Sequence, residues 1–211
     1  MAFGQEIAVT PLQLANAFAA VANDGRLMMP RVVKAVADES QGKVEETEPI
    51  ELRKVISKNT AKKLREYCRA VVKEGTGSEA GLKFLSVGGK TGTAQKASPN
   101  GGYLRRKFVS SFVGFAPAED PEIVCLVTLD EPNFENRFGG VSAAPVFARI
   151  SEAIAGSSHI FDEELATTRL GGDDPGGQWF EAPNFLRLSR DAAMERARTY
   201  DLNLLCRGSG G

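Results

Sequence analysis

Two long apolar segments joined by a short turn constrain this fold more than any other feature of the sequence. Residues 108–116 and 122–130 are rich in β-branched and aromatic side chains, and residues 117–121 between them read Pro-Ala-Glu-Asp-Pro. Such a short turn returns the chain antiparallel to itself, because parallel strands need a crossover of a dozen or more residues. Residues 86–95 also read as a strand with a glycine-rich approach. The sequence therefore predicts three antiparallel strands joined by hairpins.

Helices are predicted on both sides of these strands in the sequence. Thr10 can cap a helix that has Pro11 in its first turn, and Gln13 can complete a capping box. Ser57 precedes a second amphipathic segment that stops at Gly75. A third helix is expected over residues 142–155, and a hairpin is expected between residues 31–37 and 44–47. This order predicts an α+β fold, with helices packed on an antiparallel sheet.

The end of the chain differs from the part that carries these elements. Residues 157–181 include Gly-Gly-Asp-Asp-Pro-Gly-Gly and have little periodicity, which is typical of a linker. They divide the 211-residue chain into a first unit, residues 1–156, and a small αβ element, residues 182–211. About 30 residues with one helix cannot bury a sufficient core alone, so this element is expected to dock or to be incomplete.

Composition excludes several classes of function. Lys and Arg total 26 against 27 Asp and Glu, and this net charge of −1 gives no electrostatic argument for nucleic acid or an anionic membrane. His159 is the single histidine, which argues against zinc sites and histidine catalysis, and we expect it on the surface. The three cysteines, Cys68, Cys125 and Cys206, are read as buried thiols. No stretch approaches the roughly 20 apolar residues of a membrane span. From the composition and the single histidine, no metal, cofactor or nucleic acid is expected.

The string Gly-Gly-Lys-Thr-Gly-Thr-Ala-Gln at residues 88–95 is the most informative motif. A phosphate-binding loop is rejected, because position 84 is Phe where a glycine is needed and a strand follows instead of a helix. Lys-Thr-Gly-Thr on a strand fits chemistry beside a catalytic serine. Lys90 can polarise a hydroxyl and attract a carboxylate, and Gly92 lets an acyl group approach the strand. Thr93 offers a hydroxyl and a possible oxyanion donor.

Six strings, taken together and in order, carry a family resemblance. They are TPLQLA at residues 10–15, VIS at 55–57, GTG at 75–77, GKTGTAQ at 89–95, SFVGFAP at 111–117 and AAPVF at 143–147. In this the chain resembles class B penicillin-binding proteins, the D,D-transpeptidases of peptidoglycan synthesis in cell division and elongation. The resemblance covers about residues 3–156. It implies the C-terminal portion of a penicillin-binding/β-lactamase-like transpeptidase fold.

The family's two other motifs, S-x-x-K and S-x-N, have only decoys in this chain. Ser40 and Lys43 match S-x-x-K, but they lie in a polar hairpin tip among carboxylates, where the serine lacks activation. Ser57 and Asn59 match S-x-N, but Ser57 is better read as a helix cap. The resemblance therefore implies the second half of a transpeptidase domain, with the nucleophile in a preceding part, and the chain alone is expected to be inactive.

What the resemblance implies for the site is specific. Lys90 and Thr93 are the expected catalytic residues: Lys90 orients the S-x-N hydroxyl and attracts a carboxylate, and the Thr93 N–H is one oxyanion donor. Thr91, Gly92 and Thr93 are the expected substrate-binding residues, with both threonine hydroxyls on the carboxylate of D-Ala-D-Ala or of a β-lactam. The competing function is a non-catalytic fragment that binds peptidoglycan or β-lactams, or acts as a scaffold. A carboxypeptidase or β-lactamase is disfavoured by the 143–147 string and the tail.

The resemblance carries further expectations. Residues 182–211 resemble half of a PASTA module, and the implied location is the extracytoplasmic face of the bacterial cytoplasmic membrane, with the anchor upstream and cell-division or elongation proteins as partners. Residues 97–103 are expected to form a polar loop bordering the cleft. Tyr103 and Arg105 are expected to be solvated there, with contact to a donor or acceptor peptide as the alternative. Gly139 and Gly140 read as loop residues without a role. In the family the strand at 122–130 pairs with an N-terminal strand, so the isolated chain is expected to aggregate.

Overall fold

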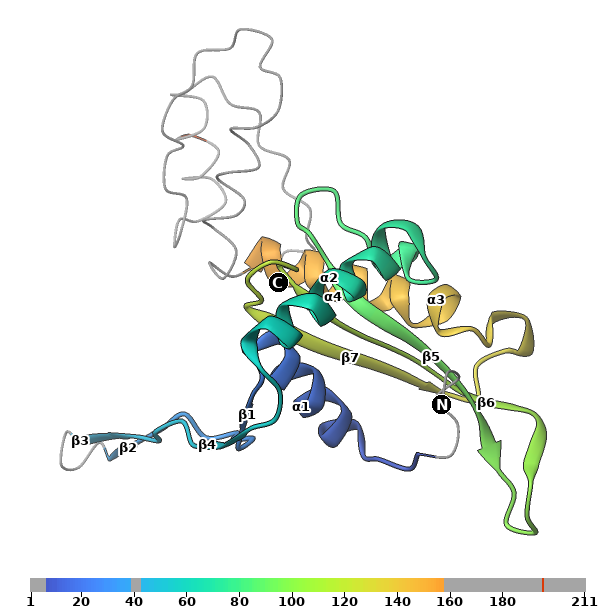
Figure 1. Cartoon of the computed structure of the whole chain (residues 1–211), viewed down its shortest axis with the longest axis horizontal. Coiled ribbons are helices and arrows are strands. Elements are labelled where there is room, and N and C mark those ends of the chain that lie inside the picture. Colours follow the sequence, from blue (N-terminus) through green and yellow to red (C-terminus); the bar gives the residue numbers. More distant parts are fainter. Residues whose placement is uncertain (1–6, 39–42, 158–194, 196–211) are drawn as a thin grey trace, which may run out of the picture. The chain divides into compact units, whose positions relative to one another are not determined.

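The computed structural model describes residues 7–38, 43–157 and 195. The chain divides into two compact units, Met1–Gly171 and Gly172–Gly211. All the elements below belong to the first unit. The expected linker and PASTA-like tail lie outside the described residues, apart from Ser157, which ends the helix that begins at Ala144, and Glu195. The first unit contains a three-stranded sheet with helices on both of its faces (Figure 1). The predicted α+β class is confirmed.

The sheet consists of three antiparallel strands in the order β5-β6-β7. They are β5 (Gly88–Ala97), β6 (Tyr103–Ala116) and β7 (Ile123–Asp130). The turn between β5 and β6 covers residues 98–102, where Gly101 and Gly102 adopt φ of 88° and 71°, a region that favours glycine. The expected loop over 97–103 is therefore too long: β6 begins at Tyr103 and also contains Arg105. Pairing with β5 extends β6 beyond the predicted apolar segment.

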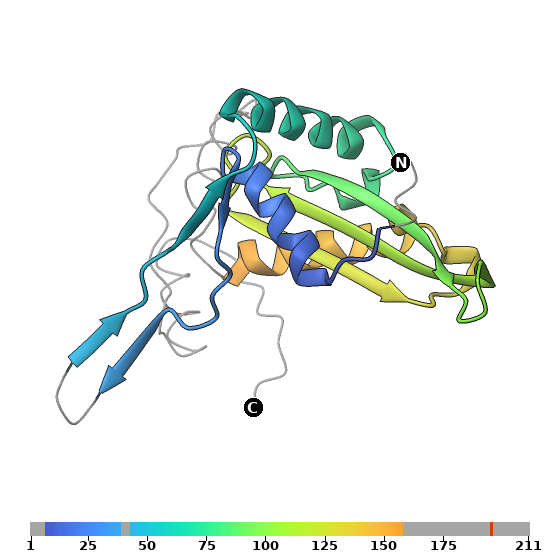
Figure 2. The same ribbon diagram turned by 60° about the horizontal axis from the view of Figure 1, so that its bottom comes forward.

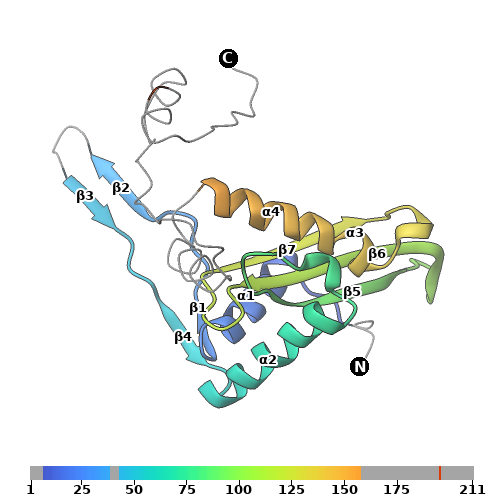
Figure 3. The same cartoon turned by 90° about the horizontal axis from the view of Figure 1, so that it is seen from above.

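One face of the sheet is covered by α4 (Ala144–Ser157), α3 (Gly139–Ser142) and the 3-10 turn η1 (Ser78–Ala80), as Figure 3 shows for the two helices. The main core lies here, where the rings of Phe112 and Phe147 meet edge to face with centroids 5.0 Å apart. The predicted single helix at 142–155 is divided at Ala143, which ends α3, and Pro145 lies in the first turn of α4. Proline has no N–H to extend the preceding turn.

The opposite face is covered by α1 (Pro11–Ala22), and α2 (Lys58–Glu74) lies beside α1 and along β5 (Figure 2). The predicted capping box is confirmed: Gln13 N donates to Thr10 Oγ1 over 3.2 Å, and Thr10 N donates to Gln13 Oε1 over 2.8 Å. Arg65 of α2 is 8% exposed and donates to the Val21 and Ala22 carbonyls at the end of α1. The two helices are thereby joined.

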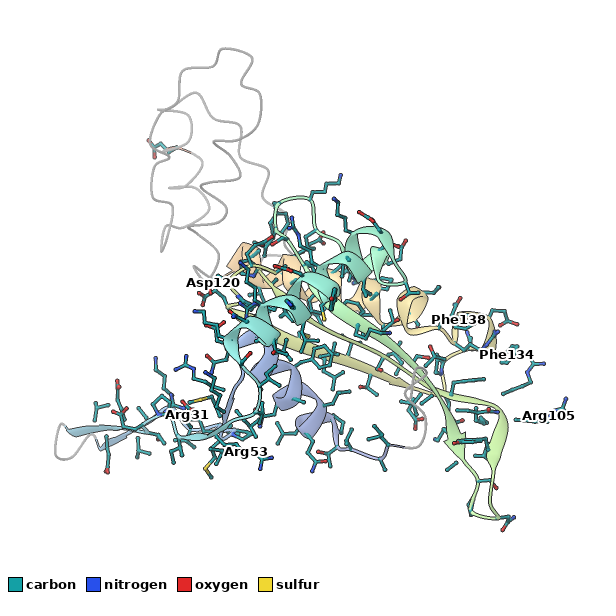
Figure 4. The ribbon with its side chains drawn as sticks, viewed as in Figure 1. Arg31, Arg53, Arg105, Asp120, Phe134 and Phe138 are labelled. Carbon is teal, nitrogen blue, oxygen red and sulfur yellow. The ribbon has the colours of Figure 1, made fainter. Side chains whose placement is uncertain are left out.

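The residues between α1 and α2 in the sequence form a two-stranded arm that extends from the rest of the first unit. It is built from β1 (Arg26–Met28) paired with β4 (Glu51–Lys54), and from β2 (Ala35–Asp38) paired with β3 (Lys43–Glu46). The predicted hairpin is confirmed by the pairing of β2 with β3. The pairing of β1 with β4 is an addition that the alternation of side chains in the sequence did not indicate. Apolar side chains are exposed along it, and Figure 4 shows Arg31 and Arg53 on the same arm. These exposed side chains are Met29, Val32, Val33, Val36, Val44, Ile50 and Leu52.

Three further features bear on function. Among the described residues, no helix is long and apolar enough to cross a membrane, and no group of three or more His, Cys, Asp or Glu side chains is placed to bind a metal ion. Cys68 and Cys125 are free thiols of intermediate burial, so they are less buried than expected. Burial raises the pKa of both thiols, and for Cys68 the charge of Lys90 opposes that rise. Cys206 and His159 lie outside the described residues.

Candidate functional site

The four residues expected at the site lie in the middle of β5, an edge strand of the described sheet. In register with β6, Lys90 lies opposite Val113 and Gly92 lies opposite Ser111. Because side chains alternate along a strand, Lys90 and Gly92 share the face covered by α1. Thr91 and Thr93 share the face covered by α3 and α4. One strand thus presents a cation on one face and two hydroxyls on the other.

Lys90 is exposed, and its Nζ donates to the carbonyl oxygen of Thr91 over 2.9 Å. It has no ion pair with a carboxylate among the described residues, whereas Lys96 of the same strand is paired with Asp130 and Glu131. The positive charge of Lys90 is therefore available to an incoming anion. Its contact with the Thr91 carbonyl also indicates that this carbonyl is accessible at the edge of the sheet.

A groove of about 330 Å³ lies between α1 and the sheet, and all four expected site residues line it. Its other lining residues are mostly apolar; they are Ile7, Val9, Thr10, Pro11, Leu14, Phe18, Ala94, Val109, Ser111, Val113, Leu126 and Thr128. The buried core of the opposite face has Phe112 and Phe147 fully excluded from solvent. The α1 face is thus less completely filled than the α4 face, and Lys90 lies at this unfilled side.

Gly92 lies directly against the side chain of its neighbour on β6. A Cβ at this position would lie 2.4 Å from Ser111 Oγ, far closer than two such atoms approach in real structures. The expectation that Gly92 permits close approach to the strand is compatible with this contact. The structure adds one observation: a side chain at position 92 would have to displace the Ser111 hydroxyl.

The hydroxyls of Thr91 and Thr93 are held by groups that the sequence did not reveal. Gly139 N donates to Thr93 Oγ1 over 3.1 Å, and Thr91 Oγ1 lies 2.9 Å from Thr76 Oγ1. A Cβ on Gly139 would lie 2.1 Å from the Ser111 carbonyl oxygen, and one on Gly140 would lie 2.1 Å from the Thr76 carbonyl oxygen.

The reading of the glycine pair as loop residues without a role is therefore wrong. Gly139 and Gly140 are the buried first residues of α3, and the absence of side chains lets that turn approach the threonine strand. The adjacent glycines directly before an apolar helix were the sequence signal that could have indicated this.

Of the two decoy serines, Ser57 and Ser40, the structure describes only Ser57. Ser57 is the N-cap of α2, where its Oγ accepts a hydrogen bond from Thr60 N over 3.1 Å. The prediction that Ser57 is a cap is confirmed. Ser40 lies outside the described residues, so the prediction that it is not a nucleophile stays a prediction.

An aromatic and cationic cluster continues from the Gly139 end of the site. It is built on the 3-10 turn η2 (Phe134–Asn136). The guanidinium carbon of Arg137 lies 4.2 Å from the Phe134 ring centroid and 4.3 Å from that of Phe138. Phe138 is 51% exposed, and Figure 4 shows Phe134 and Phe138 close together at the end of the molecule that also carries Arg105. An exposed apolar ring therefore directly precedes Gly139, whose N–H binds the Thr93 hydroxyl.

The model of the penicillin-binding protein transpeptidase domain matches residues 1–152 of this chain. The chain belongs to this family. Stage V sporulation protein D of Bacillus subtilis is 44% identical over 150 residues, which are 71% of this chain and 23% of that protein. The probable peptidoglycan D,D-transpeptidase PenA of Neisseria flavescens is 39% identical over 161 residues, which are 76% of this chain and 36% of that protein.

Solved structures agree with the family assignment. The structure of penicillin-binding protein 3 from Mycobacterium tuberculosis complexed with aztreonam matches with a TM-score of 0.63 and 35% sequence identity, over 72% of this chain and 36% of that chain. This part of the fold is therefore that of a penicillin-binding protein transpeptidase domain. The chain spans 23% to 36% of the length of these relatives.

Proposed function

We propose that this chain is the C-terminal part of the catalytic domain of a peptidoglycan D,D-transpeptidase. The observation that carries the proposal is Lys90: an exposed cation without a carboxylate partner among the described residues, on an edge strand and beside an apolar groove. The names of relatives such as PenA support the reaction class, and the aztreonam complex of a similar structure supports β-lactam binding.

In the proposed reaction a serine attacks the carbonyl carbon of a D-Ala-D-Ala stem peptide, and D-Ala leaves with a proton. The acyl group then passes from the serine to an acceptor amine, which forms the cross-link and regenerates the hydroxyl. A β-lactam acylates the same serine by ring opening. Lys90 orients the S-x-N hydroxyl and attracts the substrate carboxylate. No metal or nucleotide takes part in this scheme.

The backbone of β5 is suited to the proposed role of Thr93 as an oxyanion donor. In an antiparallel edge strand, the backbone groups of alternate residues point away from the paired neighbour. The Thr91 carbonyl accepts from Lys90 Nζ, so Thr91 is of the outward-pointing set. Thr93, two residues on, belongs to the same set, and we therefore place its N–H at the free edge. An oxyanion there would gain a fixed hydrogen-bond donor.

The serine of this scheme is proposed to come from a segment that precedes this chain and packs against the groove under α1. The size and apolar lining of the groove support this, and so does the greater length of the relatives. The intact protein is proposed to act at the extracytoplasmic face of the bacterial cytoplasmic membrane, with cell-division or elongation partners. The same proposal divides the chain into the transpeptidase part at residues 1–156, a linker at 157–181 and a PASTA-like module at 182–211.

Covalent labelling with a fluorescent penicillin tests the proposal. The polypeptide that carries this chain together with the proposed preceding segment is expected to become labelled, while residues 1–211 alone are expected to remain unlabelled. Lys90→Ala in the longer polypeptide should reduce the labelling rate by at least about a hundredfold, the scale of losing a preorganised electrostatic group. Lys34→Ala, on the exposed arm, serves as the matched control and should label normally.

Two results would count against the proposal. Labelling of the short chain at Ser40 would show that the polar hairpin tip holds the nucleophile. An unlabelled longer polypeptide with normal folding would favour the alternative, a binding or scaffold protein. That alternative predicts retention of the chain on purified peptidoglycan without any covalent product, and the same preparation can be used for both measurements.

A further inference from the structure

Thr76 contacts the site from a loop to which no role has been assigned. It lies between α2 and η1, is exposed, and places its Oγ1 2.9 Å from Thr91 Oγ1. Its backbone is confined on both sides. Gly140 packs against its carbonyl oxygen so closely that a Cβ would lie 2.1 Å away, and Gly77 N donates to the Val71 carbonyl over 3.0 Å. Thr76 is thus an exposed hydroxyl on a fixed backbone.

The hydrogen bonds of the two site threonines differ in one respect. A hydroxyl carries a single proton and can accept through its lone pairs. Thr93 Oγ1 accepts a hydrogen bond from the Gly139 N–H, and this bond cannot reverse because a backbone N–H only donates. Its own proton is therefore free for a carboxylate. Thr91 and Thr76 are both hydroxyls, so either can be the donor, and the proton of Thr91 is free only when Thr76 donates.

We propose that Thr76 is a positioning residue that donates to Thr91 Oγ1 and so aims the Thr91 proton at the substrate carboxylate. This inference rests on the proposed function and deepens it. A carboxylate only accepts hydrogen bonds, so its arrival selects the arrangement in which Thr91 donates to it and Thr76 donates to Thr91. Chained hydrogen bonds strengthen one another. Thr76 then donates to Thr91 Oγ1 as the Gly139 N–H donates to Thr93 Oγ1, and in each case the threonine proton is left for the carboxylate.

Pre-steady-state acylation by benzylpenicillin tests the inference in the longer polypeptide that carries the proposed serine. The experiment separates the dissociation constant of the non-covalent complex from the acylation rate of bound penicillin. Thr76→Val removes the hydroxyl and keeps the shape. We expect binding about tenfold weaker, the scale of one charge-assisted hydrogen bond, with an unchanged acylation rate. Thr76→Ser keeps the hydroxyl and should restore the wild-type dissociation constant, and Thr47→Val on the arm is the control.

A double variant separates positioning from general structural damage. In a Thr91→Val background the Thr76→Val change should cause no further loss, because Thr76 acts only through Thr91. An independent loss there, or wild-type binding by Thr76→Val, would overturn the inference while leaving the transpeptidase proposal intact. If Thr76→Val lowers the melting temperature, Thr76→Ala gives the same test without a branched apolar group. A wild-type polypeptide that benzylpenicillin does not acylate would reject the proposed function, and this inference with it.

Discussion

At the scale of single residues, the close contacts around β5 explain why small and polar side chains are found there. Gly92 leaves room for the Ser111 hydroxyl, and Gly139 brings a backbone N–H to the Thr93 hydroxyl. In both cases the constraint comes from an atom of another element. Substitutions at such positions therefore affect stability and the geometry of the site together, whereas glycines in open turns tolerate change.

Gly139→Ala is expected to destabilise the domain by about 1–3 kcal/mol, the usual cost of forcing extra atoms into a packed site. The new Cβ would contact two carbonyl oxygens, those of Ser111 at 2.1 Å and Gly92 at 2.5 Å. Urea unfolding of the longer polypeptide, which includes the proposed preceding segment, measures the change. Gly101→Asn is the control, because nothing lies within 4 Å of a Cβ there and Asn tolerates positive φ. Equal stability of both variants would contradict the close packing of α3.

Two buried serines should respond in opposite ways to removal of their hydroxyls. Ser110 Oγ donates to the Arg137 carbonyl, whereas Ser151 Oγ has no hydrogen-bond partner among the described residues. Ser110→Ala should cost about 1 kcal/mol, while Ser151→Ala should be neutral or stabilising by a similar amount. Thermal melts of the two variants in the longer polypeptide, each lacking the same atom, measure the difference. Destabilisation by Ser151→Ala would indicate a buried water or an unrecognised partner.

At the scale of elements, ion pairs join the three strands of the sheet at the end of β5 that follows the site residues. Lys96 of β5 pairs with Asp130 of β7 and with Glu131, and Glu131 also pairs with Lys107 of β6. The hydrogen bond from Lys107 and then that from Lys96 lower the pKa of Glu131, and the hydrogen bonds from Glu131 and Asp130 raise the pKa of Lys96. One carboxylate therefore connects all three strands near the site strand.

The Glu131 contribution to stability should depend on pH in the acid range. Because its folded pKa lies below the ordinary value of 4.5, the contribution is complete above that value and is lost as the pH falls through the folded pKa. The stability difference between wild type and Glu131→Gln, measured by urea unfolding of the longer polypeptide, should therefore shrink from pH 6 toward pH 3. Glu48→Gln on the arm is the control. A difference that grows on acidification would contradict the ion-pair arrangement.

At the scale of the whole first unit, the two sheet faces are filled to different degrees. The α4 face buries Phe112 and Phe147 completely, while the α1 face keeps a groove lined by Lys90 and apolar side chains. β7 pairs only with β6 in the described sheet, so its outer edge has no strand partner there. Unpaired edges and apolar grooves both favour association.

Residues 1–211 in isolation are therefore expected to self-associate, with a broad thermal transition. Analytical ultracentrifugation and calorimetry measure these properties. Leu126→Lys places a charge in the groove and should reduce association, because it penalises burial of that surface. Val36→Lys on the arm, a matched change at an exposed valine, should have less effect. A monomer that melts sharply and cooperatively would contradict the expectation.

The sequence alone determined the local elements and the family. Capping residues such as Thr10 and Ser57 act within one turn of helix, and the apolar segments before and after the 117–121 turn act through alternation, so both are readable without neighbours. Lys90, Thr91, Gly92 and Thr93 are expected at the site because of their motif on one strand and the family resemblance of the strings around it. Their chemistry as site residues remains a proposal, but their shared position on β5 was predictable because it is local.

Only the tertiary structure decided what surrounds that strand. Gly139, 46 residues from Thr93, supplies the N–H that its hydroxyl accepts, and Thr76 reaches Thr91 from the end of another helix. No periodicity links such pairs, because hydrogen bonds between distant segments depend on how elements pack and not on spacing along the chain. The same reason explains the missed glycine pair and the divided helix at Ala143: close approach and buried contacts exist only after the sheet and helices have met.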